Sequence, residues 1–149
     1  MPIREATAVW EGNLSKGKGN MRLGSGAFEG SYSFASRFED APGTNPEELL
    51  GAAHAGCFSM ALSLFLEQAG YTSESIRTRA KVHIDKSGGG FKISTIELET
   101  EAKIPGIDEN MFLEKAEEAK KMCPVSQALS GTDISLKARL IGEPSLSQK

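Results

Sequence analysis

The chain has 149 residues, a formal net charge of −3 and a pI near 5.5. This length predicts one domain that buries roughly 70% of the surface of its extended chain. No basic excess marks a nucleic-acid partner, and the 39% hydrophobic and 25% charged shares are ordinary for globular proteins. The N-terminal segment carries Arg4 and Glu5 and lacks the apolar core of a signal peptide, so we expect a cytoplasmic protein.

The N-terminal segment shows the pattern of short strands and turns. ATAVWEG and KGNMRLG are extended candidates, and GSYSFASRF alternates Tyr32 and Phe34 with small residues. We therefore expect a meander of N-terminal strands over about 5–38.

A long apolar helix is predicted over about 46–69. Residues 49–66, LLGAAHAGCFSMALSLFL, carry no formal charge. Asn45 and Pro46 form a helix start, and Gly70 forms a stop. The helix is roughly 36 Å long, and its alanines, glycines and serines are too weakly apolar for a membrane span. We expect it to lie in a protein core or between two chains.

The C-terminal half predicts a hairpin, two helices and a last strand. The hairpin covers about 75–104, with a turn at SGGG and a β-bulge near Ser94 or Thr95 where the apolar parity changes. An amphipathic helix and a short helix after Pro124 follow over about 108–130. The last strand covers about 133–141, and we expect a loosely ordered tail over 142–149.

These elements predict an α+β fold with two groups of antiparallel strands around a long central apolar helix. Each group has about three strands, which leaves exposed edges and covers the helix poorly within one chain. We therefore expect an intertwined homodimer in which the helices pack together and the sheets are completed between protomers.

The two cysteines, Cys57 and Cys123, are 66 residues apart and form no CxxC motif. A disulfide closing that loop would contribute about 4 kcal/mol. A reducing cytoplasm disfavours a permanent bond and favours a catalytic, redox-sensing or metal-binding pair. A zinc site would also need His54 and His83, whose spacing matches no compact zinc pattern.

The two cysteines differ in their local surroundings. Cys123 precedes Pro124 and is placed to cap a short helix, where N–H groups stabilise a thiolate. Cys57 lies within the apolar helix, where its pKa should rise unless a cation is delivered from elsewhere. His54 shares its helix face, although a lone helical histidine is more often a packed core residue. On these residues alone, a purely structural Cys57 stays open.

Three segments resemble one known family. GTNPEELLGAAHAGCFSMALS at 43–63, WEG near the N-terminus and CPVSQ at 123–127 resemble the OsmC/Ohr family of thiol-dependent hydroperoxide reductases, and its OsmC branch in particular. The resemblance extends from about residue 6 to residue 140. It implies a single OsmC-like domain over 1–149.

The resemblance also implies a function. Cys57 is expected to attack a hydroperoxide, and Cys123 to resolve the sulfenic acid as a disulfide, with Arg37 and Glu48 as further site residues. Organic peroxides are the expected substrates, with weaker action on hydrogen peroxide. No separate cofactor is expected, because two thiols carry the electrons, and an external dithiol, for instance a lipoylated protein, restores them. The alternative is a redox sensor that uses the same disulfide without turnover.

Each charged or aromatic candidate has a structural alternative. Glu48 lies at the capping-box position relative to Asn45, and Arg37 has the features of a solvated strand residue. Phe34, Phe58 and Met60 suit either an alkyl pocket or the core.

Helix geometry separates Glu48 from Cys57. Nine residues of helix place the two about 13.5 Å apart along the axis and on opposite faces. A carboxylate at that position can hold the Arg37 guanidinium in a bidentate pair. If both residues serve one site, we expect Glu48, with Arg37, to reach Cys57 of the partner chain.

Overall fold

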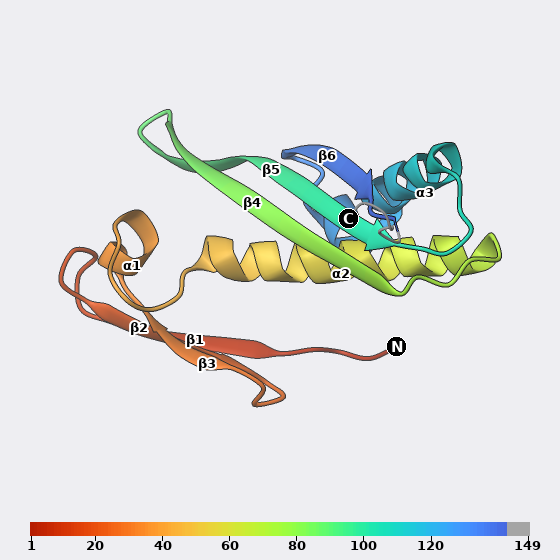
Figure 1. Ribbon diagram of the computed structural model, residues 1–149. Coiled ribbons are helices and arrows are strands. Elements are labelled where there is room, and N and C mark those ends of the chain that lie inside the picture. The colour runs from red at the N-terminus through yellow and green to blue at the C-terminus, as the bar shows by residue number, and fades with distance from the viewer. Residues whose placement is uncertain (143–149) are drawn as a thin grey trace. The chain divides into compact units, whose positions relative to one another are not determined.

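The computed structural model describes residues 1–142, so the predicted tail beyond that point lies outside the described residues. Its contacts group into two compact units, Met1–Leu49 and Leu50–Lys149. Two three-stranded sheets and one long helix form the mixed α+β architecture that the sequence predicts (Figure 1).

The first unit contains a meander of antiparallel strands in the order β1-β2-β3 and one short helix. The elements are β1 (Ala6–Glu11), β2 (Lys18–Leu23), β3 (Glu29–Tyr32) and α1 (Phe34–Phe38). The prediction of strands up to residue 38 is therefore wrong at its end. Ser33 and Ser36 form a reciprocal capping box, in which each side chain accepts from the other's backbone N–H, and this starts a helix where alternation suggested a strand.

The long helix α2 runs over Pro46–Gln68 and confirms the predicted element. Asn45 Oδ1 accepts from the Glu48 N–H at 2.7 Å, which caps the first turn. Gly70 follows the helix with a φ of 93°, the left-handed conformation that glycine adopts most readily. By length and composition alone α2 also meets the requirements of a membrane span, a property that it shares with core helices of soluble proteins.

The second unit is built on the hairpin of β4 (Ser75–Ser87) and β5 (Gly90–Lys103). Gly88 and Gly89, both with positive φ, form its turn. Thr95 pairs with His83 and Ile93 with Ile84, so Ser94 is the extra residue of a bulge. The predicted bulge is confirmed.

Strand β6 (Asp133–Leu140) lies on the other side of β5 and runs parallel to it. The expectation of purely antiparallel strands is wrong here. Two helices, α3 (Glu109–Met122) and α4 (Pro124–Ala128), connect β5 to β6. Such a helical crossover returns the chain to the end where the previous strand began, so the next strand runs in the same direction.

The core of the second unit lies between this sheet and the helices. Phe58, Leu62 and Leu66 of α2 are fully buried against Ile96 and Leu98 of β5. From α3, Phe112, Ala116 and Ala119 join the same cluster. Helix α2 therefore presents one face to the core, and this packing fixes the part of the helix that carries Cys57.

A chain of hydroxyl groups ties α2 to the sheet beside Cys57. Ser59 Oγ lies 2.7 Å from Thr78 Oγ1, which lies 2.9 Å from Thr100 Oγ1. Thr100 in turn donates to the Arg77 carbonyl at 3.2 Å. Because each hydroxyl has a partner, these polar groups are tolerated beside the core.

Candidate active site

The two cysteines meet in the second unit. Cys123 Sγ lies 2.9 Å from Cys57 Sγ, and its thiol donates a hydrogen bond to the Cys57 sulfur. Both thiols are free; Cys57 is partly exposed and Cys123 is buried. A disulfide bond is about 2.05 Å long, so a small shift of either side chain joins the two sulfurs. The structure thus brings together the two cysteines that the sequence left 66 residues apart.

Cys123 occupies a helix junction. Its backbone N–H bonds the Ala119 carbonyl at 3.0 Å, which ends α3, and its Sγ accepts from the Ser126 N–H at 3.4 Å, which begins α4. The predicted N-cap is confirmed. Pro124 at the first position of α4 has no N–H to satisfy, so the sulfur serves a donor further along the turn.

Cys57 lies far from either end of α2. Burial raises the pKa of its thiol above the ordinary value, and the neighbouring Cys123 side chain raises this pKa further, while the Val125 N–H lowers it. No cation contributes to the shift among residues 1–142. The expected rise in pKa is therefore present, and a nearby cation would be needed to offset it.

His54 is fully buried one helical turn before Cys57. Its Nε2 lies 2.7 Å from Ser126 Oγ, so its interaction is with α4. Burial lowers the pKa of His54, which keeps the ring neutral near pH 7. A neutral imidazole supplies no charge, so His54 does not act as the cation that Cys57 lacks.

Arg37 lies at the end of α1 and forms a bidentate ion pair with Glu47. Its Nε and Nη2 donate to the two carboxylate oxygens of Glu47 at 3.1 and 2.7 Å. The guanidinium also lies over the Phe38 ring, 5.2 Å from its centroid. The Glu47 side chain is 8% exposed and that of Arg37 36% exposed. Such a pair holds the guanidinium plane in one orientation while part of it faces solvent.

The loop between α1 and α2 positions the Arg37–Glu47 ion pair. Ser36 Oγ donates to the Thr44 carbonyl at 2.7 Å, and Asn45 Nδ2 donates to the Ser36 carbonyl at 3.1 Å. Gly43 has a φ of 119°, and a Cβ there would lie 2.8 Å from the Ser31 carbonyl oxygen. The GTNPEEL segment is thus a tight connection that places the start of α2 beside α1.

The assignment of Glu48 as the partner of Arg37 is wrong. Glu48 accepts from the Thr44 hydroxyl at 2.9 Å, and its own N–H is bonded by the Asn45 cap. Both glutamates fit the first turn of a helix, so composition did not separate them. The capping-box position of Glu48 could have separated the two glutamates. A carboxylate that bonds groups at the helix start is not available to Arg37, and its neighbour Glu47 is.

The aromatic and apolar candidates divide between core and surface. Phe58 is fully buried in the core, and the Phe34 ring packs at a tilt against Phe38 with ring centroids 5.0 Å apart. Met60, by contrast, is 77% exposed on α2. The core reading therefore holds for Phe58.

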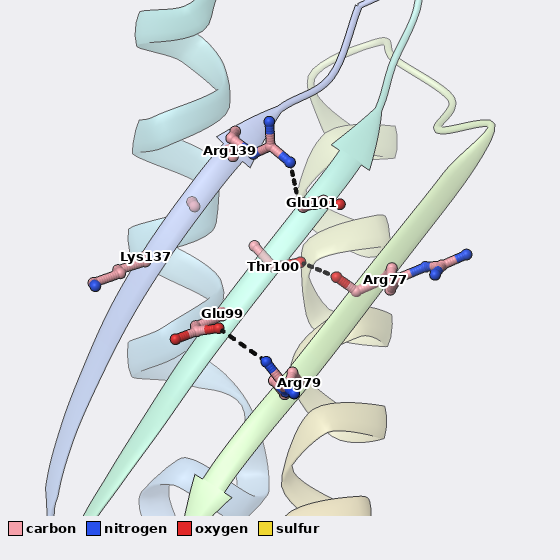
Figure 2. A pocket seen from close by; sticks show the side chains of 8 residues that line it. Arg77, Arg79, Glu99, Thr100, Glu101, Lys137 and Arg139 are labelled. Atoms are coloured by element: carbon pink, nitrogen blue, oxygen red, sulfur yellow. Dashed lines mark hydrogen bonds and ion pairs between the residues drawn. The ribbon is translucent and has the colours of Figure 1, made fainter.

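The face of the sheet opposite α2 is charged and separate from the thiols. Figure 2 shows Arg79 directed at Glu99 and Arg139 at Glu101, with Lys137 on the neighbouring strand. Lys81 also pairs with Glu99 at 3.0 Å and holds the pKa of that carboxyl below its usual range. These are exposed cross-strand ion pairs, which contribute little stability and include neither cysteine.

No group of three or more His, Cys, Asp or Glu side chains that could hold a metal ion occurs within residues 1–142. His54 bonds Ser126, and His83 lies on the charged face with Glu97. The two histidines thus lie in different surroundings.

Comparison with known proteins gives concordant matches. A family model described as OsmC-like protein matches residues 38–137. The chain is 50% identical over 127 residues to Peroxiredoxin OsmC of Escherichia coli (strain K12), covering 85% of this chain and 89% of that protein. It is 33% identical over 104 residues to Organic hydroperoxide resistance protein OhrB of Bacillus subtilis (strain 168), covering 68% and 74%.

A solved structure shares the fold. An OsmC-like protein of unknown function from Vibrio cholerae O1 biovar eltor str. N16961 superposes with a TM-score of 0.74, covering 93% of this chain and 99% of that one. Its sequence identity is 15%, so the likeness concerns the fold alone.

The short distance between the sulfurs predicts a fast intramolecular disulfide. Under mild oxidation by diamide, the chain should lose both free thiols and the mass of two hydrogen atoms, without forming intermolecular bonds. Thiol titration and intact mass spectrometry measure this. Cys57→Ser and Cys123→Ser should each abolish the product, and persistence of two free thiols in the oxidised wild type would contradict the geometry.

Proposed function

The chain belongs to the OsmC-like family, and on that basis we propose that it is a thiol-dependent peroxidase that reduces organic hydroperoxides through Cys57 and Cys123. The observation that carries the proposal is the pair of free thiols with sulfurs 2.9 Å apart. The names of its relatives, peroxiredoxin and organic hydroperoxide resistance protein, support the same type of reaction. Hydrogen peroxide is expected to be the weaker substrate.

The first step is an attack on the peroxide. The Cys57 thiolate attacks the outer oxygen of the hydroperoxide, an S–O bond forms as the O–O bond breaks, and the departing alkoxide takes a proton to become the alcohol. Cys57 is then a sulfenic acid. Since its pKa is raised by burial, this step needs a cation that stabilises the thiolate and the developing alkoxide.

The second step converts the sulfenic acid to a disulfide without further oxidant. The Cys123 sulfur attacks the sulfenic sulfur, an S–S bond forms, the S–O bond breaks, and the hydroxide leaves with the thiol proton as water. An external dithiol then reduces the disulfide by exchange and is itself oxidised to a disulfide. A lipoylated protein is one carrier with that chemistry.

Arg37 is the cation that we assign to Cys57, with Glu47 as its positioning residue. The bidentate pair leaves the guanidinium partly exposed, as a group that meets a substrate must be. Glu47 replaces Glu48 in this role. A carboxylate that accepts two N–H groups fixes the direction of the guanidinium more tightly than solvent does.

We further propose that the enzyme is a homodimer and that Arg37 acts on Cys57 of the partner chain. Met60 and Leu64 on α2 are 77% and 49% exposed, an unusual state for large apolar side chains on the central helix. Glu47 precedes Cys57 by ten residues of α2, which corresponds to about 15 Å along the helix axis. A second chain would cover the apolar side chains and bring its own cation to the thiol.

Turnover is the direct test of the proposed function. The reduced wild type with excess dihydrolipoamide should consume many equivalents of cumene hydroperoxide, and Cys57→Ser should consume none. Peroxide loss followed by a ferric–xylenol orange assay measures both. One equivalent consumed per chain would indicate a sensor instead, and unchanged thiols after peroxide treatment would indicate an inert protein.

The two neighbouring glutamates provide a matched pair of variants. Glu47→Gln should lower the rate of Cys57 oxidation roughly 10- to 100-fold, because it weakens a hydrogen-bonded ion pair worth about 1.5–3 kcal/mol. Glu48→Gln keeps an amide oxygen for the Thr44 hydroxyl and should stay near the wild-type rate. Stopped-flow fluorescence or competitive oxidation measures the rates. A slower rate in Glu48→Gln than in Glu47→Gln would instead make Glu48 the residue that positions Arg37.

Mixed dimers test the assignment across the interface. Cys57→Ser and Arg37→Met chains should each be nearly inactive alone, since one lacks the nucleophile and the other the cation. A mixed dimer carries one intact site if Arg37 acts on the partner chain, so mixing after mild dissociation should restore up to a quarter of wild-type turnover at statistical exchange. No recovery in a verified heterodimer would place Arg37 and Cys57 of one chain in one site.

A further inference from the structure

A hydrogen bond connects the two helices that carry the cysteines. His54 on α2 and Ser126 on α4 are 72 residues apart in sequence, and the His54 Nε2 lies 2.7 Å from the Ser126 Oγ. Both residues are buried, at 0% and 5% exposure. The contact is therefore shielded from water, which would otherwise compete for either group.

Ser126 uses two different atoms to reach two different partners. Its hydroxyl meets His54, and its backbone N–H donates to Cys123 Sγ at 3.4 Å. Cys57 lies three residues after His54 on the same helix. The four residues thus form a ring of contacts between α2 and α4. His54 bonds the Ser126 hydroxyl, the Ser126 N–H bonds the Cys123 sulfur, and that sulfur contacts Cys57.

We propose that His54 and Ser126 are positioning residues for disulfide formation, because their hydrogen bond seats the start of α4, and with it the Cys123 sulfur, against Cys57. Helix α4 has only five residues, too few for a helix to hold its place without tertiary contacts. The biological meaning of this role rests on the proposed function. The positioning of Cys123 against Cys57 does not depend on that function, since it should favour the disulfide with any oxidant.

The orphaned nitrogen of His54 supports a role beyond packing. Its Nδ1 is buried and has no hydrogen-bond partner within residues 1–142. An apolar side chain would fill the space without that unfavourable burial. Burial lowers the pKa of His54, which favours the neutral ring. A neutral imidazole keeps one N–H, and one N–H is enough to bond the serine.

The predicted consequence concerns the second chemical step. Once Cys57 is a sulfenic acid, Cys123 must attack before another peroxide does. If α4 is less firmly seated, the sulfenic acid persists, and a second hydroperoxide converts it to the sulfinic acid and a second alcohol. Neither the His54 nor the Ser126 side chain takes part directly in the first step, so the predicted defect is in the second.

The test uses variants that separate the hydrogen bond from the shape of the side chain. Glutamine and methionine have similar length and volume, but only glutamine offers an N–H near the place of Nε2. Ser126→Ala removes the hydroxyl and keeps the backbone N–H to Cys123. Ser59→Ala is the control, because it removes a partly buried hydroxyl of α2 that faces Thr78 instead of α4.

Equilibration of the full-length protein in glutathione redox buffers gives the effective concentration of the two thiols, independently of peroxidase activity. This effective concentration should fall roughly tenfold in His54→Met and in Ser126→Ala, because each variant loses one buried hydrogen bond. His54→Gln and Ser59→Ala should stay within about twofold of wild type, and the double variant His54→Met/Ser126→Ala should be no worse than either single variant. If His54→Met does not fold, Ser126→Ala alone decides.

Wild-type effective concentration in Ser126→Ala would overturn the proposal, as would a fall in His54→Gln equal to that in His54→Met. A lowered melting temperature in His54→Met and Ser126→Ala without a change in effective concentration would also overturn it, by reducing the bond to a structural role. A second readout follows peroxide treatment, where mass spectrometry should find Cys57 sulfinic acid at lower peroxide doses in these two variants. If wild type consumes no peroxide while the redox buffers still separate the variants, the proposed function fails and this inference stands.

Discussion

The position of the partly buried Cys57 thiol in the middle of a 23-residue apolar helix is the constraint on which the site depends. A mid-helix sulfur is remote from the N–H groups that lower a thiol pKa at a helix start, and its surroundings raise that pKa. Every group that makes the sulfur reactive must therefore come from another element. The Val125 N–H, which lowers the pKa, comes from α4, and the proposed cation comes from α1 of the partner chain.

The β5-to-β6 crossover explains how α4 reaches Cys57. A parallel β6 requires a crossover connection, and within that connection α3 stops and α4 begins. Cys123 is the residue shared by the two helices, so its backbone position is fixed by both. The same crossover places Ser126 opposite His54. The topology of the sheet and the meeting of the two sulfurs are thus consequences of one connection.

Local signals in the sequence predicted most of the elements, and the errors lie where tertiary contacts decide. Helix α2, the bulge at Ser94 and the cap at Cys123 each have a local cause that can be recognised in a few residues. The direction of β6 depends on the whole crossover. The choice of Glu47 over Glu48 depends on hydrogen bonds between α1 and the GTNPEEL loop, which adjacent identical residues do not reveal.

The two flanks of Cys57 are anchored in different ways, and this bears on how its reactivity is controlled. Three residues before it, His54 is bonded to α4; two residues after it, Ser59 is bonded to the sheet. The helix around Cys57 therefore has little freedom to move toward a cation, so on the proposed mechanism the cation comes to the sulfur. On the proposed mechanism, a thiol whose pKa is raised by partial burial reacts slowly with oxidants until the Arg37–Glu47 pair and a hydroperoxide are both in place.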